Sequence, residues 1–248
     1  MNTTEAIHSR QTAKVLADSP WAPSLTQDEQ ERPREHLLNL AAKAPYHYKS
    51  AERYKEGVQT SSLPFRCYTA DGATCNTLAT KLETLDPPPG KILNMLWAAE
   101  LLIITTWLPD VFGTQPEQRE MEPLPFVGNL RNMEHIAATS AAIQNMLLGA
   151  TAEGHPNYWS SGGMLRQKSA RNMLQISMEE VMLGAVFIFP KDAVERAEEF
   201  KPGKLREEGK VLGTFSKKIT LKYYMPSLFS TFSKILRNYA IAHCLLAL

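Results

Sequence analysis

The sequence is poor in the residues that mark several specialised classes of protein. Its three cysteines, Cys67, Cys75 and Cys244, are too few and too scattered for a disulfide framework or a zinc site, so we expect free thiols. Glycine and proline are not in excess and 44% of the residues are hydrophobic, which excludes a disordered chain. The net charge of +1 provides no overall field to attract nucleic acid. These features indicate a globular protein of one or two domains.

Long apolar runs are also missing. The first twenty residues lack the apolar centre of a secretory signal, and the most apolar stretch, residues 92–108, is interrupted by Asn94 and Glu100. That stretch is shorter than the roughly 20 residues that span a bilayer. No Gly-x-Gly-x-x-Gly motif is present, so nothing indicates a Rossmann dinucleotide site. We therefore expect a soluble, cytoplasmic protein that binds no nucleic acid and no metal.

Charge is divided unevenly along the chain. No acidic residue follows Glu208, and residues 209–248 carry +6 while residues 1–208 carry −5. Within the basic part, apolar residues recur at helical spacing with Lys234 and Arg237 opposite them, which is typical of an amphipathic helix. We interpret residues 1–208 as one domain and residues 209–248 as a basic extension. The extension either packs within protein, which we favour, or lies on a membrane surface. A tail acquired by fusion or by a shifted reading frame would have the same pattern.

Periodicity and breaker residues predict alternating helices and strands, and hence an α+β or α/β fold. The expected helices span residues 4–17, 26 or 34 to 45, 74–85, 92–99, 134–153 and 178–181, and the expected strands span 64–69, 101–107 and 184–190. The strand 101–107 is apolar throughout, as in a strand buried on both faces. Helix 134–153 has small and apolar residues around most of its circumference and is predicted to be buried nearly all round. Residues 109–131 are expected to form a long loop.

One cationic stretch lies near the start of the chain. Arg10 and Lys14 are four residues apart, on one face of the predicted helix, with donors from Gln11 and Thr12 between them. An arginine on such a face can donate two parallel hydrogen bonds to a phosphate. The same spacing is also common on solvated helix faces.

Two further cationic stretches have the same two explanations. Lys43 and His47 follow the end of a predicted helix, where they could face a bound ring or phosphate. A histidine at that place also commonly caps the last carbonyls. Lys204 and Arg206 lie in a cationic turn, residues 201–206, which begins with Lys201 after the last predicted strand. This turn could neutralise a phosphate, or could simply form a solvated charged loop.

A glycine-rich stretch follows helix 134–153. In it, Trp159, Ser160 and Ser161 are followed by Gly162 and Gly163. Glycines let backbone N–H groups approach a ligand closely, so this stretch could hold a planar heterocycle against backbone donors. An ordinary structural loop would also use these residues.

The order and spacing of these stretches resemble those of the FMN-dependent nitroreductase family, particularly its compact branch, over residues 5–206. The residues that carry the resemblance are IHSRQTAK at 7–14, AKAPYH at 42–47, PFRCY at 64–68, AAIQNMLL at 141–148, YWSSGG at 158–163 and the strand 182–189. No single one of these motifs is specific, and the resemblance depends on their ordered co-occurrence.

This resemblance implies a nitroreductase-like fold, with a central, mostly antiparallel sheet flanked by helices, and an intertwined homodimer with FMN at its interface. It implies that Arg10, Gln11 and Thr12 bind the flavin phosphate and ribityl chain, and that Lys14 lies near the pyrimidine edge. Other implied cofactor contacts are Lys43, His47, Trp159, Ser160, Ser161, Gly162, Lys204 and Arg206, with Trp159 to Ser161 supplied by the partner subunit.

The implied activity is the reduction of nitroaromatics, quinones or similar small acceptors. NAD(P)H would reduce FMN by hydride transfer and the acceptor would reoxidise it, in a ping-pong cycle. Flavin chemistry needs no catalytic triad or carboxylate pair, and none is visible in the sequence. Two departures from the family pattern stand out: Gln11 replaces an Arg or His, and the insert 109–131 is expected to lie over the active site as a lid. The alternatives are a specialised enzyme on the same scaffold (a reductive dehalogenase, dehydrogenase or flavin-processing enzyme) and a non-catalytic flavin-binding protein.

Overall fold

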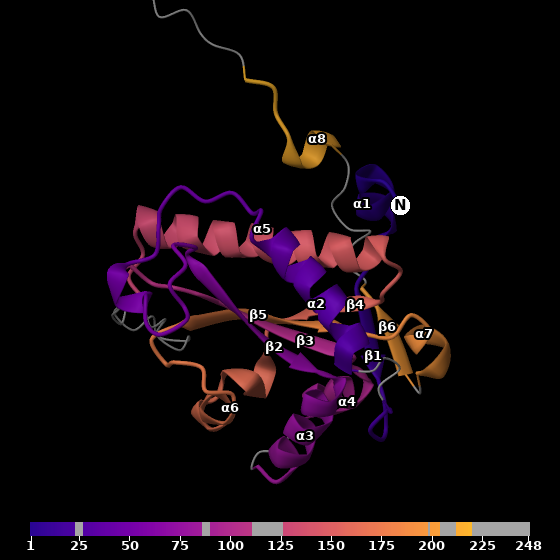
Figure 1. Ribbon diagram of the computed structural model, residues 1–248. Helices are drawn as coiled ribbons and strands as arrows, with labels where there is room; N and C mark the ends of the chain where they lie inside the picture. Colours follow the sequence, from indigo (N-terminus) through magenta and orange to yellow (C-terminus); the bar gives the residue numbers. More distant parts are fainter. Residues whose placement is uncertain (23–26, 86–89, 111–125, 198, 204–211, 220–248) are drawn as a thin grey trace, which may run out of the picture. The chain divides into compact units, whose positions relative to one another are not determined.

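The structure is a computed structural model, and it describes residues 1–22, 27–85, 90–110, 126–197, 199–203 and 212–219 (Figure 1). The chain divides into two compact units, residues 1–206 and 207–248. In the second unit the described part is one helical turn, α8 (Leu212–Phe215), followed by exposed residues 216–219. The amphipathic helix predicted near the end of the chain lies outside the described residues. In the described part, no helix has the length and hydropathy needed to cross a membrane.

The first unit alternates helices and strands. Its helices are α1 (Thr3–Ser9), α2 (Gln27–Ala41), α3 (Gly72–Glu83), α4 (Lys91–Ala98), α5 (Leu130–Ala152), α6 (Lys168–Met173) and α7 (Ala193–Arg196), with 3-10 turns η1 (Glu52–Tyr54) and η2 (Gly163–Arg166). Its strands are β1 (Ala13–Leu16), β2 (Phe65–Asp71), β3 (Leu101–Trp107), β4 (Asn157–Ser160), β5 (Val181–Ile188) and β6 (Glu199–Pro202).

The strands form an antiparallel sheet in the order β2-β3-β5-β4, and a separate antiparallel pair of β1 and β6. Every residue of β3 is buried, as the apolar run predicted. A parallel bridge between Thr12 and Asn157 connects the start of β1 to the edge strand β4. The β1-β6 pair therefore lies beside the β4 edge of the main sheet.

Alternate residues of β3 face two separate hydrophobic cores, because successive side chains of a strand point to opposite faces. Leu102 and Ile104 pack with α3 and α4, whereas Leu101 and Ile103 pack with α2 and α5. Figure 1 shows the result: α5 and α2 cover one face of the sheet, and α3 and α4 cover the other. This arrangement confirms the predicted fold class, an antiparallel sheet flanked by helices.

The first helix is shorter than predicted. It ends at Ser9, and Arg10 leaves the helix with φ −58° and ψ 120°. Residues 13–16, predicted as helix, instead pair with residues 199–202 as β1. The prediction 4–17 was wrong in its second half because this long-range pairing outweighs the local helical propensity.

Helix α5 differs from its prediction in start and burial. It begins four residues before the predicted residue 134, where the Asn129 side chain caps it by accepting a hydrogen bond from the N–H of Asn132 at 2.8 Å. Its burial is one-sided, since Ala137 and Gln144 are exposed. Small residues are compatible with either environment, so composition overestimated the burial. The predicted end is confirmed, because Gly154 follows the C-cap with φ +86°.

Two further differences concern short elements. Residues 178–180 form a turn and Val181 begins β5, so the helix predicted at 178–181 was wrong. The short strands β4 and β6 were not predicted. Helix α2 begins at Gln27 and contains Pro33, which matches the earlier of the two predicted starts.

Candidate functional site

Two of the predicted stretches lie side by side within one chain. Thr12 forms the bridge with Asn157, and the Lys14 ammonium group lies 5.6 Å from the centre of the Tyr158 ring. The resemblance implied that a partner subunit supplies Trp159 to Ser161. In the structure, the same chain brings the strand that carries Trp159 and Ser160 against its own N-terminal strand.

The junction of these stretches is held by specific contacts. The Asn157 amide donates hydrogen bonds of 3.0 Å to Thr151 Oγ1 and to the carbonyl of His155, which ties β4 to the end of α5. The N–H of Gly203 donates to the carbonyl of Thr12 at 3.1 Å. A Cβ on Gly203 would lie 2.8 Å from the Thr12 Cβ, so glycine is required for this approach.

The turn after β4 has a glycine-dependent shape. Gly162 and Gly163 have φ of +103° and +48°, a region that favours glycine. The hydroxyl of buried Ser160 accepts a hydrogen bond from the N–H of Gly162 at 3.1 Å, while Ser161 is exposed. The guanidinium of Arg166 donates to the Ser161 carbonyl. The turn is therefore a fixed loop that presents Ser161 at its surface.

The Trp159 side chain lies directly over Gly184 of the neighbouring strand. A Cβ on Gly184 would be only 2.0 Å from the indole Nε1, so any other residue there would displace the ring. With 37% of its surface exposed, Trp159 presents an aromatic face to solvent beside the turn. A planar ligand could stack on such a face.

Lys14 lies in a positively charged environment. Burial is the main cause that lowers the pKa of its ammonium group, and Lys201, its cross-strand partner, lowers it further. Glu199 acts in the opposite direction. A partly desolvated cation of this kind is suited to an anionic or electron-rich group of a ligand.

Lys43 and His47 lie elsewhere in the chain. His47 Nδ1 lies 2.7 Å from Glu134 Oε2, near the start of α5, and the His47 side chain is 73% exposed. Lys43 is exposed and lines a groove of about 370 Å³ between α1, α2 and α5. Thr151, which contacts β4, lies seventeen residues after Glu134 on α5, or about 25 Å along the helix axis. The structure does not bring His47 to the Lys14 side of the site within one chain.

The remaining predicted site residues differ in their exposure and in whether the structure describes them. Arg10 is half-buried at the C-cap of α1, Gln11 is exposed and Thr12 is half-buried. Lys204 and Arg206 lie outside the described residues. Sequence reasoning missed Lys91 and Arg166 as neighbours of the site. The signal for Lys91 was its position directly after the breaker at residues 86–90, and Lys201 begins the cationic turn already noted.

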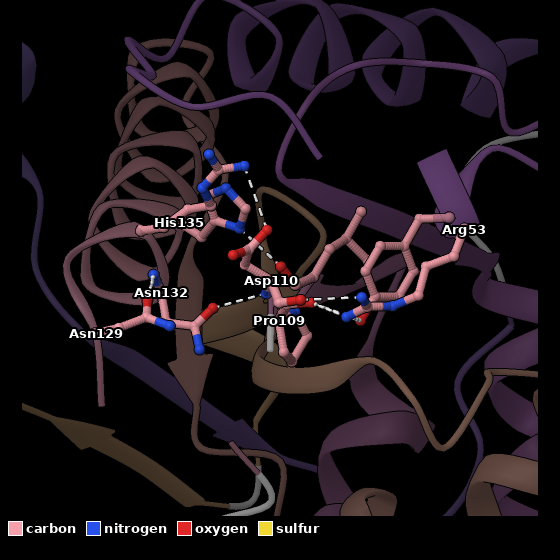
Figure 2. A network of polar contacts seen from close by, with 9 residues as sticks. Arg53, Pro109, Asp110, Asn129, Asn132 and His135 are labelled. Atoms are coloured by element: carbon pink, nitrogen blue, oxygen red, sulfur yellow. Dashed lines mark hydrogen bonds and ion pairs between the residues drawn. The ribbon is translucent and has the colours of Figure 1, made fainter. Parts of the chain in front are cut away.

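The insert predicted at 109–131 is only partly described, because residues 111–125 lie outside the described part. Figure 2 shows the contacts that fix its first end, at Pro109 and Asp110. Asn132 Oδ1 accepts a hydrogen bond from the N–H of Asp110 at 2.7 Å, and Asn132 Nδ2 donates to the carbonyl of Val127 at 2.8 Å. Arg53 donates to the carbonyls of Pro109 and Asp110. One buried amide thus bonds both ends of the insert, and a role of the insert as a lid stays a prediction.

Comparison with known proteins places the fold. No family model and no curated protein matches the sequence. A nitroreductase-like family protein from Bacillus cereus is structurally similar, with a TM-score of 0.55, 21% identity, and coverage of 89% of this chain and 97% of that one. A protein from Desulfovibrio desulfuricans described as a putative nitroreductase in complex with FMN has a TM-score of 0.49 and 15% identity, over 89% of this chain and 99% of that one. The chain therefore has the nitroreductase-like fold that its ordered motifs predicted.

Proposed function

We propose that this protein is an FMN-dependent oxidoreductase that transfers electrons from NAD(P)H to nitroaromatics, quinones or similar electron-poor acceptors in a ping-pong cycle. The observation that carries the proposal is the contact between the Lys14 strand and β4, which leads into the glycine-rich turn, through the Thr12–Asn157 bridge and the Lys14–Tyr158 pair. The nitroreductase-like fold supports it.

The residues at this junction fit a flavin phosphate ester. Gly162 and Gly163 adopt positive φ, and Ser161 and Gly163 are exposed, so a ring can reach the backbone of this turn from solvent. Lys14 supplies a partly desolvated cation, and Trp159 an exposed aromatic face. When bound, FMN would supply the two-electron redox chemistry that no side chain provides.

Each residue has a distinct role in this proposal. Arg10 donates to the phosphate, with Gln11 and Thr12 as neutral donors along the ribityl chain. Lys14 stabilises negative charge at the pyrimidine edge, which grows when the ring is reduced. The side chains of Ser160, Ser161 and Trp159 and the backbone of Gly162 border the ring. We assign the second phosphate cation to Lys204 or Arg206.

A complete site would need two chains, because His47 lies far from Lys14 in one chain. We propose a homodimer in which the partner subunit contributes Lys43 and His47. The exposed side of α5 offers an apolar contact surface, with Leu130 and Met133 each 58% exposed. Ala137 lies on the same side and is also exposed.

The dimer is tested with an arginine in this surface. Ala137→Arg places a charge on the exposed side of α5 without entering either core, so we expect a folded monomer by sedimentation with reduced FMN content. Lys81→Arg, on α3, is the matched control, because it keeps the charge of an exposed position. A dimer that survives Ala137→Arg would contradict this interface.

Cofactor binding is tested by titrating the flavin-free protein with FMN and with riboflavin. Loss of a charge-assisted hydrogen bond costs about 1.5–3 kcal/mol. Arg10→Ala should therefore weaken FMN binding by roughly 10- to 150-fold, and riboflavin binding little. Arg34→Ala, which removes a half-buried cation of α2, is the control and should leave both affinities unchanged. An unchanged FMN affinity in Arg10→Ala would overturn the phosphate assignment.

A further inference from the structure

Three lysines from three different elements lie together at the edge of the candidate site. Lys14 on β1 and Lys201 on β6 are directly opposite one another in the strand register. Lys91 is the first residue of α4, the helix that packs against β1, and its charge interacts with those of Lys201 and Lys14. We refer to these three residues as the lysine cluster.

The cluster carries more positive than negative charge. Among the described residues, Glu199 is the carboxylate that interacts with these lysines, and it forms an ion pair with Lys201. Lys201 is the main cause that lowers the pKa of Lys91, and it also lowers the pKa of Lys14 after the larger effect of burial. Like charges this close destabilise one another unless an anion neutralises them. With three cations and one carboxylate, the cluster suits a ligand group with a charge of about −2.

The lysine cluster borders the glycine-rich turn. Lys14 lies over the ring of Tyr158, and Tyr158 precedes Ser160 by two residues in the same strand. A Cβ on Gly163 would lie 3.3 Å from Ile92 Cγ1, so the turn packs against the first turn of α4, next to Lys91. A ligand in the cluster would therefore lie at the mouth of the site proposed for FMN.

We propose that Lys91 and Lys201, beside Lys14, bind a phosphate group of the reduced dinucleotide donor. This proposal rests on the proposed function. FMN carries a single phosphate, which we assign to the segment that begins at Arg10. Lys91 is exposed and the Lys201 side chain is 42% exposed, and a donor that binds and leaves in every cycle needs a phosphate contact that can be reached from solvent.

The donor offers phosphate in two places, the pyrophosphate shared by NADH and NADPH and the 2′-phosphate of NADPH alone. The test measures equilibrium binding of NAD⁺ and NADP⁺ to the FMN-loaded protein by calorimetry, and the donor concentration that half-saturates anaerobic flavin reduction. The variants are Lys91→Gln and the double variant Lys91→Gln/Lys201→Gln. Lys81→Gln removes an exposed lysine of α3 and is the matched control.

We expect Lys91→Gln to weaken NADP⁺ binding and raise half-saturation by NADPH about tenfold, with an unchanged limiting rate of reduction and FMN affinity. An effect on NADP⁺ alone assigns the cluster to the 2′-phosphate, and an equal effect on both dinucleotides assigns it to the pyrophosphate. Unchanged dinucleotide binding in the double variant would overturn the proposal, as would weakened FMN binding alone. Failure of the wild-type protein to bind FMN would instead contradict the proposed function, and it is detected before any variant is compared.

Discussion

The imidazole of His135 is buried beneath the end of β3, with its Nδ1 2.7 Å from the carbonyl oxygen of Leu108 (Figure 2). This geometry requires Nδ1 to carry a hydrogen, because a carbonyl oxygen can only accept. Burial lowers the pKa of His135, and the Leu108 carbonyl and the Asp110 carboxylate oppose that effect without reversing it, while Arg131 adds to it. The folded protein therefore holds this histidine neutral.

This relationship predicts that stability depends on pH below neutrality. The unfolded chain protonates His135 near pH 6.5, whereas the folded protein does so only at a lower pH, so the unfolded state binds more protons in between. The contribution of His135 to stability is complete above about pH 6.5 and decreases as pH falls toward the folded pKa.

His135→Asn is the matched variant, because the Asn amide can donate to the Leu108 carbonyl but does not titrate. Urea unfolding at about pH 7.5, 6.5 and 5.5 should show the wild type losing more stability than His135→Asn as the pH decreases. If the wild type and His135→Asn lose equal stability as the pH decreases, His135 is not held neutral in the folded protein.

The two hydrogen bonds of Asn132 predict a stability effect at the ends of the insert. Asn132→Ala leaves the N–H of Asp110 and the carbonyl of Val127 without this partner, at a cost of about 2–3 kcal/mol in the free energy of unfolding. Gln144→Ala, at an exposed position of the same helix, is the control and should change stability by less than about 0.5 kcal/mol. If the two variants unfold at the same urea concentration, the amide does not hold the insert.

The close contact of Gly184 with Trp159 predicts a change at the flavin. Gly184→Ala places a methyl group where the indole now lies, so the ring must move. We expect the visible spectrum of bound FMN to shift in Gly184→Ala and in Trp159→Ala, while circular dichroism shows the same fold. Gly154→Asn, at the end of α5, is the control, since asparagine tolerates positive φ and nothing lies within 4 Å of the place that its Cβ would occupy. Spectra unchanged in both test variants would remove Trp159 from the cofactor site.

Sequence patterns predicted the buried elements best, because burial leaves a clear signature. The continuous apolar run of β3 and the capping Gly154 of α5 identify a strand and a helix end without any tertiary information. The start of α5 was harder to predict from the sequence, since the cap at Asn129 lies in a segment whose Pro and Glu content favours a loop. Arg10 and Lys14 were predicted to share one helical face, but Arg10 ends α1 and Lys14 lies in β1, which exists only through its pairing with β6.

The separate stretches that form the candidate site could be identified from the sequence, but their arrangement in space could not. The motifs around Thr12 and Tyr158 are far apart in the sequence, and only the sheet edge brings them together. The sequence around Lys91 and Lys201 does not indicate that they lie close together, since their proximity arises from the packing of α4 against β1, the partner strand of β6. The separation of His47 from Lys14 along α5 could not be predicted from spacing either.

The central claim is tested most directly by the absorption spectrum of the purified protein before and after anaerobic addition of NADPH. The account predicts flavin bands in the visible region that bleach on addition of NADPH and return when a quinone or nitroaromatic is added. Flavin bands that neither NADPH nor NADH bleaches would contradict the oxidoreductase function and leave a flavin-binding protein. A colourless protein that also fails to take up added FMN would contradict the cofactor assignment itself.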